Sequence, residues 1–321
     1  MTLRSGHETH AAAPDAPLVP QQPEGGASAP DAARGFVFAF FAYLMWGFLP
    51  LYMKAVAHIP ALEVVAHRIL WSVPIAGALL LLLGRTSDVA AALRSPRTLA
   101  MAALTACLIA LNWLVYVWAI AAGRAVETAL GYYINPLVSV MLGALLLGER
   151  LTRAQIVAVA LAAVAVAILT VDAGGLPWVS LTLAISFAAY GFFKKTLPVG
   201  PSQGFFLEVA ILGLPALAWL AYLQVIGTAH FVPSRMTDVA LLLFAGPATA
   251  LPLILYAFGA KLLRIATLGL MQYIVPTMIA LIAIFVFGEP FGPVRLLAFA
   301  LIWIALAIYT WSVIAATRRA S

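Results

Sequence analysis

Long apolar runs constrain the fold of this chain more than any other feature. From residue 35 to residue 316, about ten runs of roughly 20 residues follow one another, and they contain few charged side chains. A helix of about 20 residues, at ~1.5 Å per residue, matches the ~30 Å hydrocarbon core of a bilayer. With 64% hydrophobic and only 9% charged residues, the chain lacks the polar coat of a soluble domain. It is therefore predicted to be an all-α integral membrane protein with ten transmembrane helices.

Hydropathy and helix-breaking residues together place the boundaries of these spans. The predicted spans lie near residues 35–55, 62–83, 98–121, 126–147, 153–171, 176–196, 203–225, 238–260, 265–287 and 293–316. Residues 1–34 are rich in Pro, Ala and Gly and have almost no large apolar side chain, so we expect a disordered cytoplasmic tail there. Residues 317–321 are predicted to form a short cytoplasmic C-terminus.

The positions of the basic residues predict the orientation of the chain. Lys and Arg residues of short loops stay on the cytoplasmic side of a membrane. If the amino terminus is cytoplasmic, the outer side holds only Lys54, Arg124, Arg235 and Arg295 of the 18 Lys and Arg residues, and Arg68 lies within a span. A multi-pass protein of the cytoplasmic (inner) membrane with both termini in the cytoplasm is therefore predicted. This asymmetry also accounts for the net charge of +6, and no nucleic-acid partner is predicted.

Two parts of the chain repeat one another. Tyr133-Ile134-Asn135-Pro136, followed by Gly148-Glu149, returns at a constant offset as Tyr273-Ile274-Val275-Pro276, followed by Gly288-Glu289. Each half, residues 35–171 and residues 176–316, contains five predicted spans. Because five is odd, the second half must enter the membrane from the opposite side. The sequence therefore predicts an inverted repeat of two five-helix halves, the arrangement behind alternating access in many secondary transporters.

Two prolines occupy corresponding positions in these halves. Pro136 lies near the middle of the fourth predicted span and Pro276 near the middle of the ninth. A proline has no amide hydrogen, so we expect helix kinks that free the carbonyls of Tyr132 and Gln272. Interruptions at corresponding points of two halves indicate a transport site, because freed backbone is tolerated only where protein or a water-filled cavity meets it. The alternative is a pair of packing kinks that neighbouring helices repair.

Several strings of this sequence resemble those of a known family. The strings are Ala42-Tyr43-Leu44-Met45-Trp46-Gly47, Ala66-His67-Arg68-Ile69-Leu70-Trp71-Ser72, Leu111-Asn112-Trp113 and Leu130-Gly131-Tyr132-Tyr133-Ile134-Asn135-Pro136-Leu137, the last followed by Gly148-Glu149-Arg150. With them, residues 35–316 resemble the RarD group of EamA-type permeases in the drug/metabolite transporter superfamily. The resemblance implies ten helices from a duplicated five-helix, EamA-like unit, and a permease of the cytoplasmic membrane. It implies no particular substrate.

A solute site is predicted at the midplane between the two halves. Polar groups in hydrocarbon are costly unless something bonds them, and small-molecule sites combine apolar walls with a few polar groups. The predicted substrate-binding residues are Tyr43, Trp46, Arg68, Asn112, Tyr116, Tyr132, Asn135, Gln272 and Tyr273. We expect Asn112→Leu to weaken solute binding while leaving assembly intact. Aromatic belts at the membrane surface and ordinary core packing are the alternative roles for these side chains.

Glu63, His67 and Arg68 form the densest charged group in any predicted span. An unpaired charge inside a membrane is costly, so Arg68 requires a partner. In one interpretation, Glu63 and neighbouring carbonyls satisfy Arg68. In the other, Arg68 contacts an anion, while Glu63 and His67 couple transport to protons, because histidine changes its charge near neutral pH.

The predicted function is that of a secondary transporter, a permease that moves a small metabolite or drug-like solute by alternating access, with export as the expected direction. Gly143 and Gly148 have the spacing of the phosphate-cradling Gly-x-x-x-x-Gly-Lys pattern, but its lysine is absent. ATP hydrolysis by this chain is therefore not expected. Transport is expected to be driven by the gradient of the solute itself or by exchange for protons. Glu208, expected to pair with Lys194 or Lys195, is a weaker candidate for a proton site.

Other classes of protein are weighed against this prediction. An intramembrane enzyme acting on a lipid or peptide is the main alternative, but the five histidines lack ligand spacing and the only cysteine is Cys107. No catalytic residue, metal site or cofactor is therefore predicted. Ala154, Ala158 and Ala162 form a small-residue stripe that would suit either a partner-binding scaffold or internal packing. A homodimer stays open among the predicted partners, beside the solute and the lipid bilayer.

Overall fold

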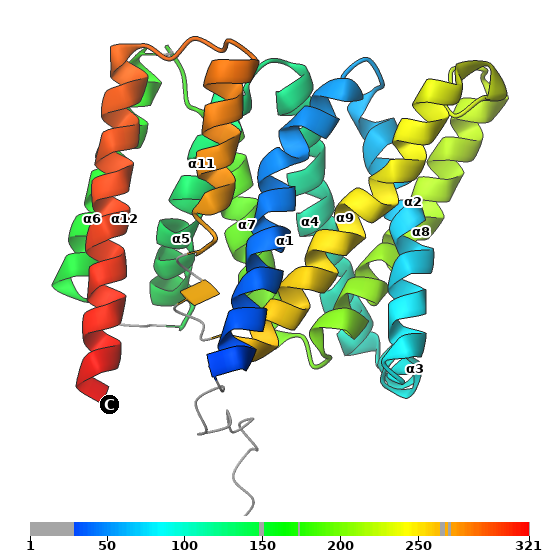
Figure 1. Ribbon diagram of the computed structural model, residues 1–321, viewed down its shortest axis with the longest axis horizontal. Helices are drawn as coiled ribbons and strands as arrows, with labels where there is room; N and C mark the ends of the chain where they lie inside the picture. Colours follow the sequence, from blue (N-terminus) through cyan, green and yellow to red (C-terminus); the bar gives the residue numbers. More distant parts are fainter. Residues whose placement is uncertain (1–28, 148–150, 173, 264–266, 269–270, 321) are drawn as a thin grey trace, which may run out of the picture.

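The computed structural model describes residues 29–147, 151–172, 174–263, 267–268 and 271–320. Every regular element within these residues is helical, as the apolar runs predict (Figure 1). The helices are α1 (Ala29–Ala55), α2 (Ala61–Leu82), α3 (Thr86–Leu93), α4 (Pro96–Ala121), α5 (Ala125–Leu147), α6 (Arg153–Asp172), α7 (Trp178–Thr196), α8 (Pro201–Val225), α9 (Met236–Leu262), α11 (Ile274–Leu281) and α12 (Pro293–Ala320). A 3₁₀ turn (Pro233–Arg235) precedes α9, and a π-helical turn (Ile282–Val286) follows α11.

Most of these helices have the length and composition of membrane spans. In the described part of the chain, eight helices are long and apolar enough to cross a bilayer: α1, α2, α4, α5, α6, α8, α9 and α12. Two further apolar stretches, Trp178–Lys194 and Ile274–Val286, are shorter. The protein is therefore a multi-pass helical membrane protein. Its short apolar stretches coincide with the sixth and ninth predicted spans.

The start of α1 and the presence of α3 differ from the prediction. α1 begins at Ala29, inside the stretch expected to form a disordered tail, and the rest of that tail lies outside the described residues. The short helix α3 was not predicted. Its Val89 and Ala92 are buried in a small cluster with Leu80 and Leu207, so packing against α2 and α8 stabilises a helix too short to be stable alone.

The two paired prolines have different surroundings. α5 runs unbroken through Pro136, whereas α11 begins at Ile274 and holds Pro276 in its first turn. Amides of a first helical turn have no carbonyl partner within the helix, so Pro276 removes no helix bond. The Gln272 carbonyl accepts a hydrogen bond from the Val275 amide at 3.2 Å. The prediction that this carbonyl is free is therefore wrong, because the chain turns before the proline instead of kinking a continuous helix.

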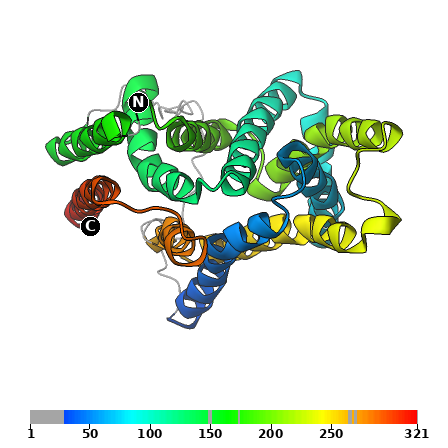
Figure 2. The same ribbon diagram turned by 90° about the horizontal axis from the view of Figure 1, so that it is seen from above.

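Helices of the two halves pack mainly against one another. α1 packs along α9, α5 along α7, α2 along α8 and α9, and α6 along α12. α6 and α12 stand together at one end of the molecule, and α8 stands at the other (Figures 1 and 2). Ala158 and Ala162 of the alanine stripe on α6 are buried. These alanines therefore serve packing within the chain and are not free to bind a separate partner.

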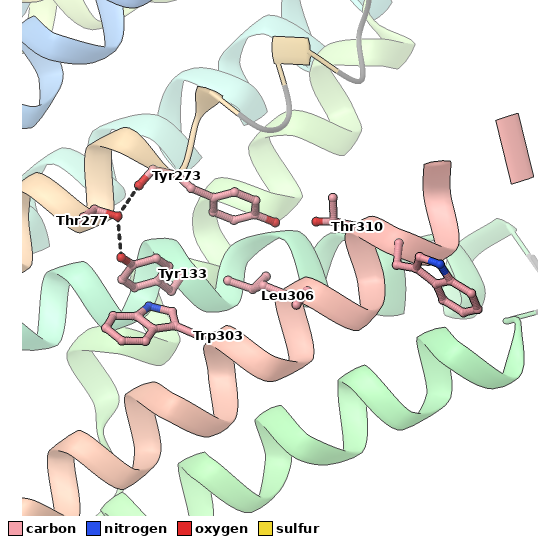
Figure 3. Close-up of a pocket in the computed structure, with 8 residues that line it drawn as sticks. Tyr133, Tyr273, Thr277, Trp303, Leu306 and Thr310 are labelled. Carbon is pink, nitrogen blue, oxygen red and sulfur yellow. Dashed lines mark hydrogen bonds between the residues drawn. The ribbon is translucent and has the colours of Figure 1, made fainter. Parts of the chain in front are cut away.

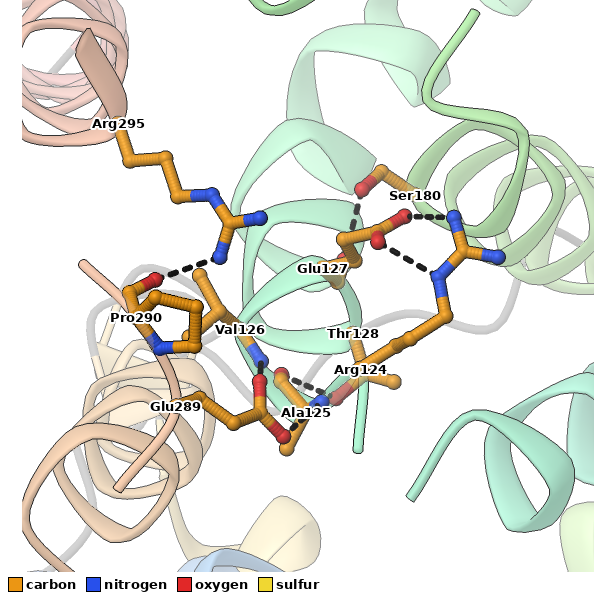
Figure 4. A network of polar contacts seen from close by, with 9 residues as sticks. All are labelled: Arg124, Ala125, Val126, Glu127, Thr128, Ser180, Glu289, Pro290 and Arg295. Atoms are coloured by element: carbon orange, nitrogen blue, oxygen red, sulfur yellow. Dashed lines mark hydrogen bonds and ion pairs between the residues drawn. The ribbon is translucent and has the colours of Figure 1, made fainter. Parts of the chain in front are cut away.

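A carboxylate of the second half holds the start of α5 (Figure 4). Glu289 is 8% exposed, and its two oxygens accept the amides of Ala125 and Val126 at 2.7 and 2.8 Å. A carboxylate at a helix N-terminus satisfies unpaired amides and interacts favourably with the helix dipole. Beside it, Arg124 and Glu127 form an ion pair of 2.6 Å within the first turn of α5. These contacts hold the first turn of α5, the helix that carries several predicted site residues.

Candidate functional site

A cavity of ≈ 700 Å³ lies between helices of the two halves. Side chains from α1, α2, α4, α5, α7, α8, α9 and α11 line it. The predicted substrate-binding residues among its lining are Tyr43, Trp46, Arg68, Asn112, Tyr116, Tyr132, Asn135 and Gln272. Pro276 also lines the cavity. Residues that are far apart in the sequence thus meet around one space large enough for a small organic molecule.

Aromatic rings form much of the cavity wall. Tyr43, Trp46 and Tyr256 make a cluster in which the ring centroids lie 5.8, 5.9 and 5.7 Å apart. The rings of Tyr116 and Tyr132, two further lining residues, lie with their centroids 6.0 Å apart. Edge-to-face and tilted ring pairs of this kind pack favourably. Such a wall suits a solute with an apolar or aromatic body.

Asn112 joins three helices at the cavity wall. Its side-chain amide nitrogen donates to the Leu183 carbonyl at 3.1 Å and to the Ser186 hydroxyl at 3.0 Å. The Tyr132 hydroxyl donates to the Asn112 side-chain oxygen at 3.1 Å. Because both amide hydrogens are used by α7, Asn112 holds α4, α5 and α7 together. The expectation that Asn112→Leu leaves assembly intact therefore conflicts with the geometry.

Arg68 enters the cavity from α2 as a buried cation. Its side chain is 4% exposed, and its Nε donates to the Thr249 hydroxyl at 3.1 Å. The guanidinium carbon lies 4.9 Å from the centre of the Trp113 ring, which is cation–π distance. Nη1 is buried and has no hydrogen-bond partner among the described residues. The arginine is thus held in place through Nε, while Nη1 is a buried donor without a partner in the described part of the chain.

Glu63 and His67 lie on α2 outside the cavity lining. Glu63 accepts hydrogen bonds from the backbone amide of His230 at 2.7 Å and from its ring Nδ1 at 2.8 Å. The interpretation in which Glu63 satisfies Arg68 is therefore wrong. The reason is helix geometry, because residues five positions apart point about 140° away from one another. His67 accepts a hydrogen bond from the Trp71 indole at 3.1 Å.

The cavity extends toward the end of the bundle where α2 ends and α8 begins. Arg85 and Lys194 are among the lining residues at this end. Glu208, which is 1% exposed, forms an ion pair with Lys194 with an Nζ–Oε1 distance of 2.6 Å. The Tyr190 hydroxyl donates to the other oxygen of Glu208 at 3.2 Å. Lys194 is one of the two lysine partners predicted for Glu208, and the side chain of Lys195, the other, lies outside the described part of the structure.

Tyr273 lies in a different place from the other predicted site residues (Figure 3). It lines a second pocket of ≈ 560 Å³ between α5, α11 and α12, together with Tyr133, Thr277 and Trp303. The Thr277 hydroxyl donates to the Tyr273 carbonyl at 2.7 Å, so the Tyr133 hydroxyl donates to Thr277 at 2.6 Å. The structure does not bring Tyr273 to the central cavity.

Sequence reasoning missed several residues of the cavity wall. Trp113, Phe187 and Thr249 line the cavity and were not predicted. Trp113 adjoins Asn112, so its place beside a predicted polar residue was an available signal. Thr249 is a polar residue within the apolar run of α9, which is a weaker signal. The sequence gives no such signal for Phe187, because an aromatic residue in an apolar helix usually packs against lipid or the protein core.

Comparisons with known proteins identify the family. Residues 33–171 match the EamA-like transporter family. Protein RarD of Streptomyces exfoliatus is 41% identical over 285 residues, which cover 89% of this chain and 90% of that protein. An uncharacterized transporter of Pseudomonas aeruginosa is 42% identical over 287 residues, covering 89% of this chain and 96% of the relative. A solved crystal structure with 20% identity superposes with a TM-score of 0.54, covers 87% of this chain and 97% of the other, and shares the fold.

A multi-pass helical protein with a central cavity and these relatives is a membrane transporter. The chain belongs to the RarD-type permeases of the EamA family. The family resemblance found in the sequence strings is thereby confirmed. Family membership also favours a transporter over the alternative of an intramembrane enzyme.

Proposed function

We propose that the protein is a secondary transporter of the cytoplasmic membrane that carries a small organic solute through the central cavity by alternating access. The observation that carries this proposal is the cavity itself, ≈ 700 Å³ of space between helices of both halves. Its aromatic wall and few polar groups have the composition of a small-molecule site. Tyr43, Trp46, Tyr132, Asn135 and Gln272 contribute to it and are proposed to contact the solute.

Ten spans and an inverted repeat are part of this proposal. If α1, α2, α4, α5 and α6 correspond to α7, α8, α9, α11 and α12, the contact of α1 with α9 has its counterpart in that of α4 with α7. Likewise, the contact of α5 with α7 corresponds to that of α1 with α11. α2 with α8, α5 with α11 and α6 with α12 then pair each helix with its own counterpart. A two-fold relation of this kind supports the rocking of one half against the other.

The cavity is proposed to face the cytoplasm in this conformation. Leu83 and Arg85, two lining residues beyond the end of α2, are exposed. By the distribution of basic residues, this end of the bundle is the cytoplasmic one. Arg68 and Tyr116 are lining residues deeper in the bundle and are buried. We propose export as the direction, in which solute enters the cavity from the cytoplasm in this conformation and leaves on the outer side.

Polar contacts between the halves are proposed to close the outer side. Near the outer ends of the helices, Glu63 bonds His230, and the His58 ring donates to Asp238 at 2.8 Å. Glu289 bonds the start of α5. Each of these contacts joins residues of different halves and would have to break or rearrange before the cavity opens outward. In this scheme Glu63 acts at the outer closure, and proton coupling through Glu63 and His67 stays a prediction.

The proposed topology predicts where fused reporters will lie. Reporters placed after Arg94, Lys195 and Arg319 are expected in the cytoplasm, and one placed near Thr228 is expected outside, because the spans alternate from a cytoplasmic amino terminus. Fusions to green fluorescent protein and to alkaline phosphatase report the two sides separately. Alkaline phosphatase activity at Arg319 would mean an odd number of crossings and would exclude the inverted repeat.

Filling the cavity tests the transport function directly. Gly191 lines the cavity, and a Cβ atom added there meets nothing within 4 Å. The backbone thus has room for a side chain at this position, and Gly191→Trp is expected to place an indole in the solute path and to lower export by about tenfold or more, which corresponds to ~1.4 kcal/mol or more of lost binding. The measurement compares compounds in the medium of cells that carry the wild type, the variant or no transporter.

The matched control is Gly175→Trp. A Cβ at Gly175 also meets nothing within 4 Å, but this residue lies in the connection after α6 and does not line the cavity. We expect export at the wild-type level from this variant. Wild-type export by Gly191→Trp, at equal amounts of inserted protein, would exclude the cavity as the transport path.

A further inference from the structure

We propose that the solute of this transporter is an organic monocarboxylate whose carboxylate is held by Arg68. The proposal rests on the proposed transport function and names the chemical class of the solute. It follows from the positive charge of Arg68, which has no counter-charge in the described part of the protein. A solute bound in the cavity could supply that counter-charge.

The guanidinium of Arg68 is buried and only partly satisfied. Among the described residues its one hydrogen bond runs from Nε to the Thr249 hydroxyl, and no carboxylate lies within ion-pair distance. The Thr249 hydroxyl gives its own hydrogen to the Ala245 carbonyl at 2.8 Å, so it is a pure acceptor toward Arg68. Nη1 is buried without a partner. An arginine in this state offers hydrogen-bond donors and a positive charge to whatever enters the cavity.

The acidic side chains of the neighbouring helices are already used. Glu63, on the same helix, bonds His230, and Glu208 bonds Lys194 and Tyr190. The Trp113 ring gives Arg68 a cation–π contact, which contributes about 0.5–2 kcal/mol. Removing a charged group from water costs several kcal/mol, so this ring compensates for only part of the loss. An anionic solute would compensate for the rest.

The geometry favours a carboxylate with a single charge. With Nε bound to Thr249, the terminal nitrogens form the edge of the guanidinium that has no hydrogen-bond partner among the described residues, and this edge matches the two oxygens of a carboxylate. A phosphate dianion would require a second free cation beside Arg68. Among the described lining residues, Lys194 is neutralised by Glu208, and Arg85 follows the far end of α2, 17 positions further along the chain. The Tyr116 hydroxyl, buried without a partner in the same cavity, is a further donor for an anionic oxygen.

The rest of the cavity favours an organic anion over an inorganic one. Trp46, Tyr132, Phe187 and Tyr256 line the space with aromatic surface. Aromatic surface binds the apolar body of a solute and gives nothing to a hydrated inorganic ion. Arg85, exposed at the cytoplasmic end of the cavity, adds positive charge where the solute would enter. The solute class is therefore a carboxylate attached to an apolar or aromatic body.

Binding of a matched pair of probes tests this inference. Phenylacetate and phenylacetamide have nearly the same shape, but only the first is an anion. Titrated into the purified full-length protein in lipid nanodiscs, phenylacetate should bind at least about tenfold more tightly than the amide. Arg68→Met should remove this preference, and Arg68→Lys should keep part of it. Arg97→Met, the same change at an exposed arginine that does not line the cavity, should change the dissociation constant by less than about threefold.

Several outcomes would overturn the inference. Equal binding of phenylacetate and phenylacetamide to the wild type would do so, even if Arg68→Met fails to fold. An unchanged preference in folded Arg68→Met would place the anion elsewhere. Tighter binding of phenyl phosphate than of phenylacetate would exclude the monocarboxylate class. If Gly191→Trp stops export while phenylacetate and phenylacetamide bind equally, the inferred solute class is wrong and the proposed transport function stands. Normal export by Gly191→Trp would contradict the proposed transport function.

Discussion

Gly246→Ala is expected to remove most of the correctly folded protein. At this residue α9 crosses α2 so closely that a Cβ atom would lie 2.5 Å from the Trp71 Cβ, 2.7 Å from its carbonyl oxygen and 2.8 Å from its carbonyl carbon. Backbone atoms cannot rotate away, so the two helices would have to separate. Overpacking of this kind costs about 1–3 kcal/mol or more, a large share of the stability of a folded protein. Small residues let membrane helices approach in this way.

The control is the same substitution at an uncrowded glycine. A Cβ at Gly213 on α8 would meet only the Val73 side chain, at an ordinary distance of 3.5 Å. Gel-filtration profiles of detergent-solubilised fluorescent fusions should show a monodisperse peak for Gly213→Ala and aggregated or missing protein for Gly246→Ala. Equal peaks and equal melting temperatures for the two variants would mean that α2 and α9 are free to move apart.

The helical spans could be predicted from the sequence because one physical constraint sets them. Hydrocarbon thickness fixes the length of an apolar run, so eight long helices fall where the runs fall. α3 escaped prediction because eight residues show too little periodicity, and tertiary contacts of Val89 and Ala92 stabilise it. The turn before Pro276 was not predicted either. A proline within an apolar run gives the same sequence pattern whether the helix bends there or begins there.

The sequence predicted how deep in the membrane the site residues lie, but not which way their side chains point. Tyr132 and Gln272 line the central cavity, whereas their neighbours Tyr133 and Tyr273 line the pocket beside α12. Consecutive residues of a helix point about 100° apart, so one position separates the two pockets. The same pattern in both halves agrees with the proposed repeat. From the sequence alone, polarity and depth identify the region, but the packing of α12 decides which tyrosine faces the cavity.

Pairings between distant elements were the least predictable part of the site. Glu63 was considered a partner for Arg68 because the two are close in sequence, but its partner is His230, on the connection before α9. Thr249, the hydrogen-bond partner of Arg68, is equally distant in sequence. Only the packing of α2 against α8 and α9 brings these groups together. The unpaired state of Arg68, on which the proposed solute class depends, could therefore not be inferred from sequence.

Asn112→Leu is expected to lower stability and solute affinity together. The substitution removes both donors that hold α7, at Leu183 and Ser186, and the acceptor of the Tyr132 hydroxyl. Leaving buried polar groups unsatisfied costs about 1–3 kcal/mol each. A clear decrease in the melting temperature of the purified protein should therefore accompany any loss of solute binding. The sequence alone predicted that Asn112→Leu would weaken solute binding and leave assembly intact, and the contacts of Asn112 with α7 change that prediction.

A double-mutant cycle with Tyr132→Phe separates the two roles of Asn112. Tyr132→Phe removes only the hydroxyl that donates to Asn112 and leaves the contacts with α7 intact. Residues in direct contact couple by about 0.5–3 kcal/mol, so the double variant should be less destabilised than the sum of the single variants. Tyr309→Phe, on α12 and away from the central cavity, is the additive control. Strictly additive effects of Asn112→Leu and Tyr132→Phe, or a melting temperature unchanged by Asn112→Leu, would mean that this side chain does not hold α4, α5 and α7 together.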